Sequence, residues 1–239
     1  MTDFGAIEQY ADFVAQDRFR NGLHYPAVIP VDTTHQRILD IGCGDGRLPR
    51  ILAARGARVA GYDIAHEKIA EARAQEARQP LGIDYDVATP QTFRHPLVFN
   101  HATSVMVLPY APSPEDLAAF FQSAYRNLLV DSRFTSVLFS PSFKAFGEDL
   151  GSRRFNKLEG DQVEVEFIDP ASKQTQFTSV LHQYSVDQYE QAAREGGMTP
   201  AVWSKLFATR QAIEALGEAF WEPVHREQPY AVFEVRKER

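Results

Sequence analysis

A glycine-rich bend between a short apolar run and a helix-forming segment constrains this sequence more than any other feature. Residues Arg37 to Ile41 form an apolar run short enough for a buried strand, and the bend Gly42-Cys-Gly-Asp-Gly46 follows directly. Apolar residues then recur at helical spacing, Pro49 stands in the first turn where its missing N–H costs nothing, and Gly56 ends the pattern. The order is therefore strand, glycine loop, helix.

The same alternation of strands and helices continues along the chain. Strands are expected at 37–41, 57–62, 83–87, 102–108, 134–139, 202–207 and 230–236. Helices are expected at 48–55, 65–78, 114–129, 186–195 and 209–220, with Ser113 as the cap of the third and Asp116 three residues on. Such alternation indicates an α/β fold with a doubly wound, mostly parallel sheet.

Two segments fall outside this alternation. Residues 3–20 have apolar residues at helix-like spacing that end near Asn21-Gly22, so we expect a leading amphipathic helix before a Pro-bounded stretch at 25–30. Residues 141–160 look irregular and polar. The runs 163–168 and 176–181 then flank a turn and predict an inserted β-hairpin.

The glycine bend favours a cationic ligand over a dinucleotide. A bend without Cβ atoms allows close approach of a ligand, but Arg47 occupies the place of the third glycine in the dinucleotide pattern G-x-G-x-x-G. Asp40 and Asp45 would repel a pyrophosphate, by up to about 4 kcal/mol per close pair of unit charges at an effective dielectric of ~20. An ammonium or sulfonium group would be attracted instead.

Asp63, which ends the second expected strand, is a candidate ribose ligand. A carboxylate there accepts hydrogen bonds from both ribose hydroxyls, in S-adenosylmethionine and in dinucleotides alike. Ile64 follows and is placed to lie against adenine.

The segment Leu39-Asp-Ile-Gly-Cys-Gly-Asp-Gly46, with Gly61-Tyr-Asp63 shortly after it, resembles the first two motifs of the class I S-adenosylmethionine-dependent methyltransferases. Residues 104–111 and 114–117 are similar to the segment that this family places between cofactor and substrate. Residues 196–198, before the closing strands, resemble the family more weakly. The likeness covers roughly 20–139. The layout is most similar to bacterial small-molecule enzymes of the toxoflavin-methyltransferase type.

The resemblance implies a Rossmann-like seven-stranded sheet and S-adenosyl-L-methionine as cofactor, with S-adenosyl-L-homocysteine as product. Asp40, Gly42, Gly44 and Gly46 would hold the methionine end and Asp63 the ribose. Thr89 stands where family members often have an acid for adenine, and Val130-Asp-Ser-Arg133 replaces the usual Pro-Gly-Gly turn. The expected parts are an N-terminal helical cap (1–36), a cofactor-binding half (37–140), an inserted hairpin and substrate cap (141–184) and a C-terminal completion of the sheet (185–239).

Methyl transfer from a sulfonium needs alignment more than a dedicated catalytic residue, although a hydroxyl acceptor would benefit from a base. Tyr10 on the leading helix is a candidate lid, and Arg20 a candidate ligand of the methionine carboxylate. Tyr25 and Tyr110 are candidate cofactor or substrate contacts, and His182 is the candidate base. Ordinary packing or solvation is the alternative for each of them, and the commoner role for an arginine or a lone histidine in such places.

Several other residue types have plainer interpretations. Cys43 is interpreted as a small residue in a tight loop. The other histidines show no metal-ligand spacing and are expected on the surface or in loops: His24, His35, His66, His95, His101 and His225. Five phenylalanines in the insertion are expected either to line a substrate pocket or to form a small core: Phe143, Phe146, Phe155, Phe167 and Phe177.

Charge and composition narrow the function further. The formal net charge of -7 disfavours nucleic acid and anionic membranes as partners, and no apolar run approaches the roughly 18 to 20 residues of a membrane span. A single cysteine and an acidic start predict a cytoplasmic protein. We expect it to be a monomer or homodimer. The leading hypothesis is methyl transfer to O or N of a small molecule. The alternatives are an NAD-dependent oxidoreductase and a non-catalytic S-adenosylmethionine-binding protein.

Overall fold

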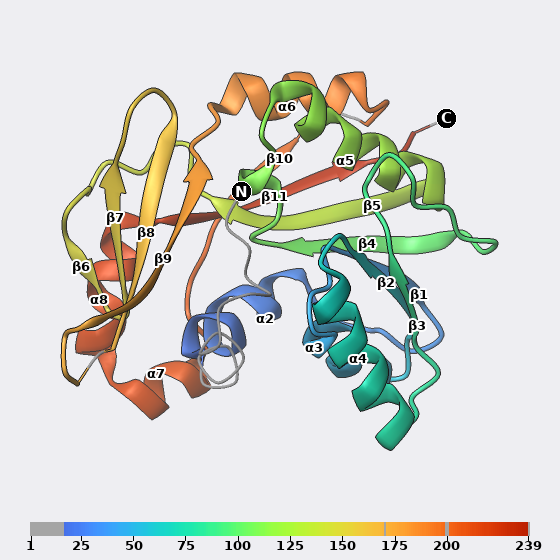
Figure 1. The fold of residues 1–239 in the computed structure, drawn as a ribbon, viewed down its shortest axis with the longest axis horizontal. Coiled ribbons are helices and arrows are strands. Elements are labelled where there is room, and N and C mark those ends of the chain that lie inside the picture. The colour runs from blue at the N-terminus through green and yellow to red at the C-terminus, as the bar shows by residue number, and fades with distance from the viewer. Residues whose placement is uncertain (1–16, 170, 199–200, 239) are drawn as a thin grey trace.

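The computed structural model describes residues 17–169, 171–198 and 201–238 and contains two sheets (Figure 1). The larger sheet has seven strands in the order β10-β11-β5-β4-β1-β2-β3. These strands are β1 (Arg37–Ile41), β2 (Arg58–Asp63), β3 (Asp84–Val87), β4 (Phe99–Val105), β5 (Leu128–Phe139), β10 (Val202–Lys205) and β11 (Tyr230–Arg236). Neighbours from β3 to β5 pair in parallel, and β11 is antiparallel to both β5 and β10. The predicted mostly parallel seven-stranded sheet is confirmed.

Helices cover both faces of this sheet (Figure 1). One face is packed by α2 (Tyr25–Val28), α3 (Arg47–Ala54) and α4 (His66–Arg78), and the other by α5 (Pro114–Asn127) and α6 (Val186–Glu195). The Ser113 hydroxyl accepts from the Asp116 amide at the start of α5, as predicted. Two separate apolar cores therefore hold the parallel strands from either side.

The second sheet is antiparallel and has four strands, in the order β6-β7-β8-β9. Strands β8 (Gln162–Ile168) and β9 (Thr175–His182) are the expected hairpin. Strands β6 (Asp149–Leu150) and β7 (Arg153–Lys157) lie in the segment predicted to be irregular. Strand β7 has the sequence RRFNK, whose buried face combines Arg153 with Phe155, so the apolar alternation that signals a strand is missing.

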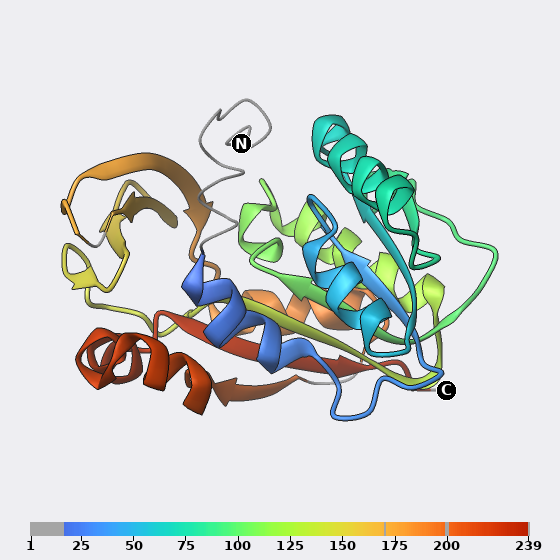
Figure 2. The same cartoon turned by 90° about the horizontal axis from the view of Figure 1, so that it is seen from below.

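The second sheet stands at the end of the main sheet where the parallel strands have their carboxyl ends (Figures 1 and 2). Phe139, at the end of β5, packs against Phe143 and Phe155 with ring centroids 5.3 and 4.9 Å apart. This aromatic cluster joins the two sheets. Open α/β sheets bind their ligands at this carboxyl edge.

Several predicted boundaries shift. The fourth strand was expected at 102–108 but ends at Val105, because Met106 has a positive φ of 54°. The fifth begins six residues earlier than the expected 134, at Leu128. The helix expected at 209–220 is two helices, α7 (Arg210–Leu216) and α8 (Glu218–Glu227), separated by Gly217 at φ 82°.

The leading helix was expected to end near Asn21-Gly22. In the part of the chain that the structure describes, helix continues through a π-helical turn η1 (Arg20–His24) into α2. Pro26 lies in the first turn of α2, where a missing N–H is tolerated. Among the described helices, none is both long and apolar enough to cross a bilayer.

Candidate active site

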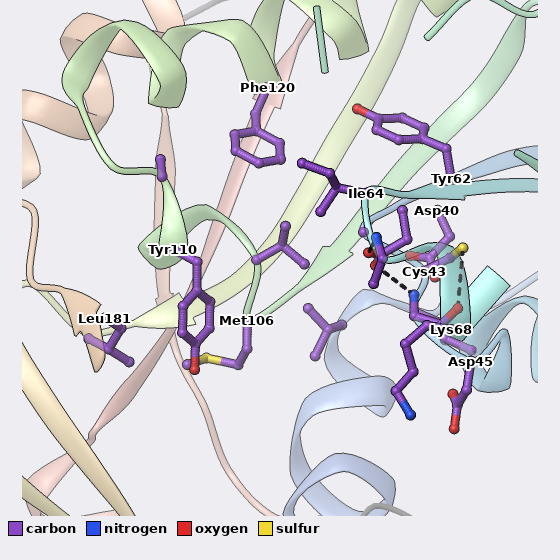
Figure 3. Close-up of a pocket in the computed structure, with 18 of the residues that line it drawn as sticks. Asp40, Cys43, Asp45, Tyr62, Ile64, Lys68, Met106, Tyr110, Phe120 and Leu181 are labelled. Carbon is purple, nitrogen blue, oxygen red and sulfur yellow. Dashed lines mark hydrogen bonds between the residues drawn. The ribbon is translucent and has the colours of Figure 1, made fainter. Parts of the chain in front are cut away.

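A cavity of about 740 Å³ opens at the carboxyl edge of the main sheet and reaches under the second sheet. Its wall includes most of the residues singled out from the sequence: Arg20, Tyr25, Asp40, Gly42, Gly44, Asp63, Ile64, Thr89 and Tyr110. Figure 3 shows Asp40 and Ile64 on one side and Tyr110 and Leu181 on the other. Segments far apart in the chain therefore form one site.

Asp63 is held by the glycine loop. The Gly44 amide donates to Asp63 Oδ2 and the Ala65 amide to Asp63 Oδ1, both at 2.9 Å. Each carboxylate oxygen keeps a further lone pair toward the cavity, as two adjacent ribose hydroxyls require. Burial raises the pKa of Asp63, and the donated amides oppose this effect. Its geometry fits a nucleoside ligand.

Asp40 lies on the central strand β1 and is deeply buried. Its Oδ1 accepts a hydrogen bond of 2.8 Å from the Thr103 hydroxyl on β4. Burial raises the pKa of Asp40 to about 7, with a smaller contribution from the charge of Asp63. A cationic group in the cavity would favour the ionised form of Asp40.

The amides of the glycine loop are engaged within the protein. The loop amides that donate to protein oxygens are those of Gly42, Cys43, Gly44, Gly46 and Arg47. The resemblance implied that the Gly42 and Gly44 amides hold the methionine end, but here Gly42 donates to the Tyr62 carbonyl and Gly44 to Asp63. Few loop amides remain to bind a pyrophosphate, and the carboxylates of Asp40 and Asp45 line the cavity, which suits an ammonium.

Two of the glycines serve packing. A Cβ on Gly42, whose φ is +72°, would lie 2.4 Å from Val107 Cγ2, and one on Gly46, whose φ is +81°, would lie 2.4 Å from the Tyr85 hydroxyl. Gly46 is absent from the cavity wall. Cys43 is buried against Gly61. A Cβ added to Gly61 would lie 2.8 Å from the Cβ of Cys43. This agrees with a small residue in a tight loop.

Two apolar side chains, Ile64 and Phe120, line the part of the cavity beyond Asp63. Ile64 is 59% exposed although it is a large aliphatic residue, and it faces the ring of Phe120 across the opening (Figure 3). Thr89 also lines this part. Its hydroxyl pairs with that of Thr92 at 3.1 Å, so no carboxylate stands at the position where relatives have one.

The other end of the cavity is a chamber between the main sheet and the second sheet. Its apolar wall consists of Met106, Phe155, Val165, Phe167, Leu181 and Tyr230. Tyr110 ties the two sheets together here, since its hydroxyl lies 2.9 Å from the Ser179 hydroxyl on β9. Phe143 instead packs on both Phe146 and Phe155, with ring centroids 5.1 and 5.2 Å apart. The insertion's phenylalanines thus supply both a pocket wall and a small core.

An ion pair that the sequence did not predict closes this chamber. Arg153 Nη2 lies 3.0 Å from Asp17 Oδ2, and both side chains are only 3% exposed. The guanidinium also stacks over Phe167 at 4.3 Å and donates to the Ser152 carbonyl. The two ionic residues are 136 positions apart, and no sequence pattern pairs them.

His182 lies outside the cavity. Its Nδ1 is 3.1 Å from Asp161 Oδ1, and its neighbour Leu181 points into the chamber instead. Side chains alternate between the faces of a strand, so the two cannot share one face. The geometry does not support His182 as the base. Tyr10 lies outside the described residues.

The histidines expected on the surface include two that are buried. His101, on β4, accepts a hydrogen bond from Arg133 at 3.1 Å. His24 lines the cavity with 3% of its surface exposed. Periodicity did not reveal His24 because the π-turn interrupts the helical spacing. Among the described residues no cluster of histidine, cysteine and carboxylate side chains suits a metal ion.

Comparisons with known proteins agree with this geometry. Residues 38–130 match a family model described as a methyltransferase domain. The ubiquinone biosynthesis O-methyltransferase of Azoarcus sp. is 30% identical over 106 residues, which are 38% of this chain and 46% of that protein. The chain thus spans about half the length of the curated relatives it matches.

Solved structures share the fold over almost the whole chain. An S-adenosylmethionine-dependent methyltransferase from Mesorhizobium loti aligns with a TM-score of 0.61 and 23% identity over 89% of this chain and 95% of its own. The sugar N-methyltransferase KedS8 from Streptoalloteichus sp. aligns with a TM-score of 0.60 and 18% identity. That alignment covers 100% of this chain and 89% of KedS8. Residues 38–130 therefore match a methyltransferase domain, and the chain as a whole shares the fold of S-adenosylmethionine-dependent methyltransferases.

Proposed function

We propose that this protein transfers the methyl group of S-adenosylmethionine to oxygen or nitrogen of a small molecule. The observation that supports this most directly is the continuity of the cavity. One space joins the carboxylates at Asp40 and Asp63 to the apolar chamber under the second sheet. At about 740 Å³ it lies within the range of pockets that enclose small ligands.

Each end of the cavity has its own role. Asp63 binds the ribose, Asp40 and the loop carbonyls attract the ammonium, and Ile64 and Thr89 lie beside adenine. Arg20 and Tyr25 line the wall near the loop and serve the methionine end. S-adenosylmethionine, when bound, supplies an electrophilic methyl group to a nucleophile held in line with its C–S bond.

The chamber orients the acceptor and excludes water. Tyr110, in the turn η2 (Leu108–Tyr110) that follows β4, lines the chamber, and the second sheet covers it. Acceptors of small size are also supported by the names of the relatives, which include an O-methyltransferase and a sugar N-methyltransferase. The proposal also includes the division of the chain into four parts, at 1–36, 37–140, 141–184 and 185–239. It further includes that the protein is a cytoplasmic monomer or homodimer and that it does not bind nucleic acid.

Calorimetric titration tests the proposal. S-adenosylhomocysteine should bind with one site, whereas reduced nicotinamide dinucleotide should not bind at the same concentrations. Incubation with S-adenosylmethionine and mixed phenols and amines should yield products heavier by one methylene, detected by mass spectrometry. Absence of nucleoside binding at millimolar ligand, or tight dinucleotide binding, would refute it.

A further inference from the structure

His24 occupies an unusual backbone position at the chamber. It is the last residue of η1, where the Tyr25 amide donates to the Arg20 carbonyl five residues earlier. A π-turn inserts one residue into a helix and rotates the side chains that follow it, and such turns are frequent at functional sites. The Thr209 amide donates to the Gly22 carbonyl at 2.9 Å and holds this turn in place.

The imidazole of His24 is buried and without a hydrogen-bond partner. Within the described part of the chain neither Nδ1 nor Nε2 has a partner, and the residue is 3% exposed. Burial lowers the pKa of His24 to about 3. The ring is therefore neutral near pH 7, with one nitrogen as acceptor and the other as donor. A buried polar group without a partner is uncommon and indicates a missing ligand or water.

Aromatic side chains surround this imidazole. Tyr230 meets it edge to face with centroids 4.4 Å apart, and Phe19 lies at 6.3 Å. Phe155 in turn packs on Tyr230 at 6.0 Å. The nearby charges of Asp17 and Arg153 are directed at each other. The chamber therefore suits a flat, uncharged molecule with a single hydrogen-bonding group.

We propose that His24 binds the hydroxyl group of an uncharged aromatic acceptor, a phenol or hydroxylated heterocycle, and receives its proton during transfer. This inference rests on the proposed methyl transfer. The hydroxyl oxygen forms the new bond to the methyl carbon, the C–S bond breaks with its electron pair remaining on sulfur, and the hydroxyl proton moves to a free nitrogen of His24. The positive charge passes briefly from sulfur to the imidazole, where the Asp17 carboxylate favours it and burial, Arg153 and Arg20 oppose it. The proton leaves to solvent with the product.

A matched pair of probes isolates this hydrogen bond. The ligand 4-hydroxyacetophenone has a hydroxyl group, and 4-methoxyacetophenone has the same ring without the donor. Both are titrated into protein saturated with S-adenosylhomocysteine. The wild type should bind the hydroxyl probe about fivefold or more tightly than the methoxy probe, as one net hydrogen bond implies.

Variants identify the partner of the probe. His24→Phe keeps the ring packing and removes both nitrogens, so the preference should fall to about one while the methoxy affinity stays within about twofold. His24→Gln keeps polar atoms at this position and should retain part of the preference for the hydroxyl probe. It replaces His24→Phe in the experiment if the phenylalanine variant folds poorly. His95→Phe is the control: His95 packs on Phe99 at 5.1 Å, outside the cavity wall, and its removal should leave the ratio as in wild type.

The outcomes separate two hypotheses. A hydroxyl preference that persists in His24→Phe overturns the role of His24, and failure of the wild type to bind either probe overturns the aromatic acceptor. In both cases intact S-adenosylhomocysteine binding leaves the methyl transfer standing. Loss of that binding in the wild type would overturn both proposals.

Discussion

Two aspartates of the site differ in how their charge is stabilised. Asp63 receives two backbone amides at 2.9 Å, whereas Asp40 has one hydroxyl donor and complete burial. A carboxylate with amide donors stays ionised more easily than one that is only buried. Under the proposed function, Asp63 therefore supplies affinity for the cofactor, and Asp40 makes the affinity and the stability depend on pH.

Replacement of Asp63 by alanine should weaken S-adenosylhomocysteine binding by about 1.5 to 3 kcal/mol, because it removes charged hydrogen bonds to the ribose. Calorimetry measures the change. Asp86→Ala, an exposed carboxylate on the adjacent strand, is the matched control and should bind as wild type. Equal dissociation constants for Asp63→Ala and wild type would show that the ribose binds elsewhere.

Asp40 should make the unliganded protein less stable as pH rises. Its pKa is raised to about 7 from 3.8. A raised carboxyl pKa contributes stability that is complete below about pH 4 and lost as pH approaches 7, here about 4 kcal/mol by linkage. Asp40→Asn keeps the acceptor for Thr103 and lacks this dependence.

Urea unfolding of wild type and Asp40→Asn at pH 5 and pH 8 provides the measurement. The free energy of unfolding of Asp40→Asn minus that of wild type should increase with pH. Affinity for the cationic ligand should change in the opposite sense and improve with pH in the wild type only. Parallel pH curves for the two proteins would contradict the argument.

At the scale of elements, contacts from η1 decide how the second sheet and the C-terminal helices are held. The Asp17–Arg153 ion pair joins the residues before η1 to β7, and Gly22 lets η1 approach α7 closely. Each contact joins segments more than a hundred residues apart. Their disruption should alter stability without touching the cofactor end.

Arg153→Met should lower the free energy of unfolding by about 3 kcal/mol, because it removes the buried partner of Asp17 at 3.0 Å and leaves that carboxylate with Arg20 at 3.5 Å. Arg154→Met is the control on the same strand. Its pairs with Asp149 and Glu166 are partly exposed, so the loss should stay below about 1 kcal/mol. Equal effects of the two substitutions in denaturant unfolding would refute the importance of the buried pair.

Gly22→Ala should destabilise the protein by about 1 to 3 kcal/mol through overpacking, since the added Cβ would lie 2.5 Å from Ala212 Cβ. The reciprocal change Ala212→Gly restores the space. In the double variant the cost should be smaller than the sum of the two single costs. Additive costs in thermal unfolding would mean that the two residues do not meet.

For the whole molecule, the cavity couples ligand binding to the stability of both sheets. Its wall includes residues from the first helical turns to β11. A ligand that binds only the native state stabilises it by about 2.7 kcal/mol at a hundred times its dissociation constant. Cofactor binding should therefore be visible in global unfolding.

S-adenosylhomocysteine at that concentration should raise the melting temperature by about 5 to 10 °C in a chain of this size. Differential scanning calorimetry should show a single transition that moves as one. A ligand that shifts only part of the transition would indicate that the second sheet unfolds separately. Adenosine alone, which lacks the methionine end, should give a smaller shift.

Much of the fold was predictable because its signals are local. The glycine bend and Asp63 are set by positive φ angles and by the end of a strand, and both lie where the spacing placed them. The alternation of strands and helices likewise led to the parallel sheet and its order of elements. Boundaries at Met106 and Gly217 differed because a single backbone conformation ended each element.

The acceptor end was not predictable in the same way. His24, Arg153 and Asp17 meet only after the chain has folded, and their sequence neighbours show no pattern that joins them. Strand β7 was missed because an arginine occupies a buried position, which is stable only beside its distant carboxylate. The sequence by itself determined the bend around Asp63 that we propose binds the nucleoside, since local backbone geometry builds it. The tertiary structure alone decided which side chains line the chamber under the second sheet, because burial and pairing across more than a hundred residues depend on packing and not on periodicity.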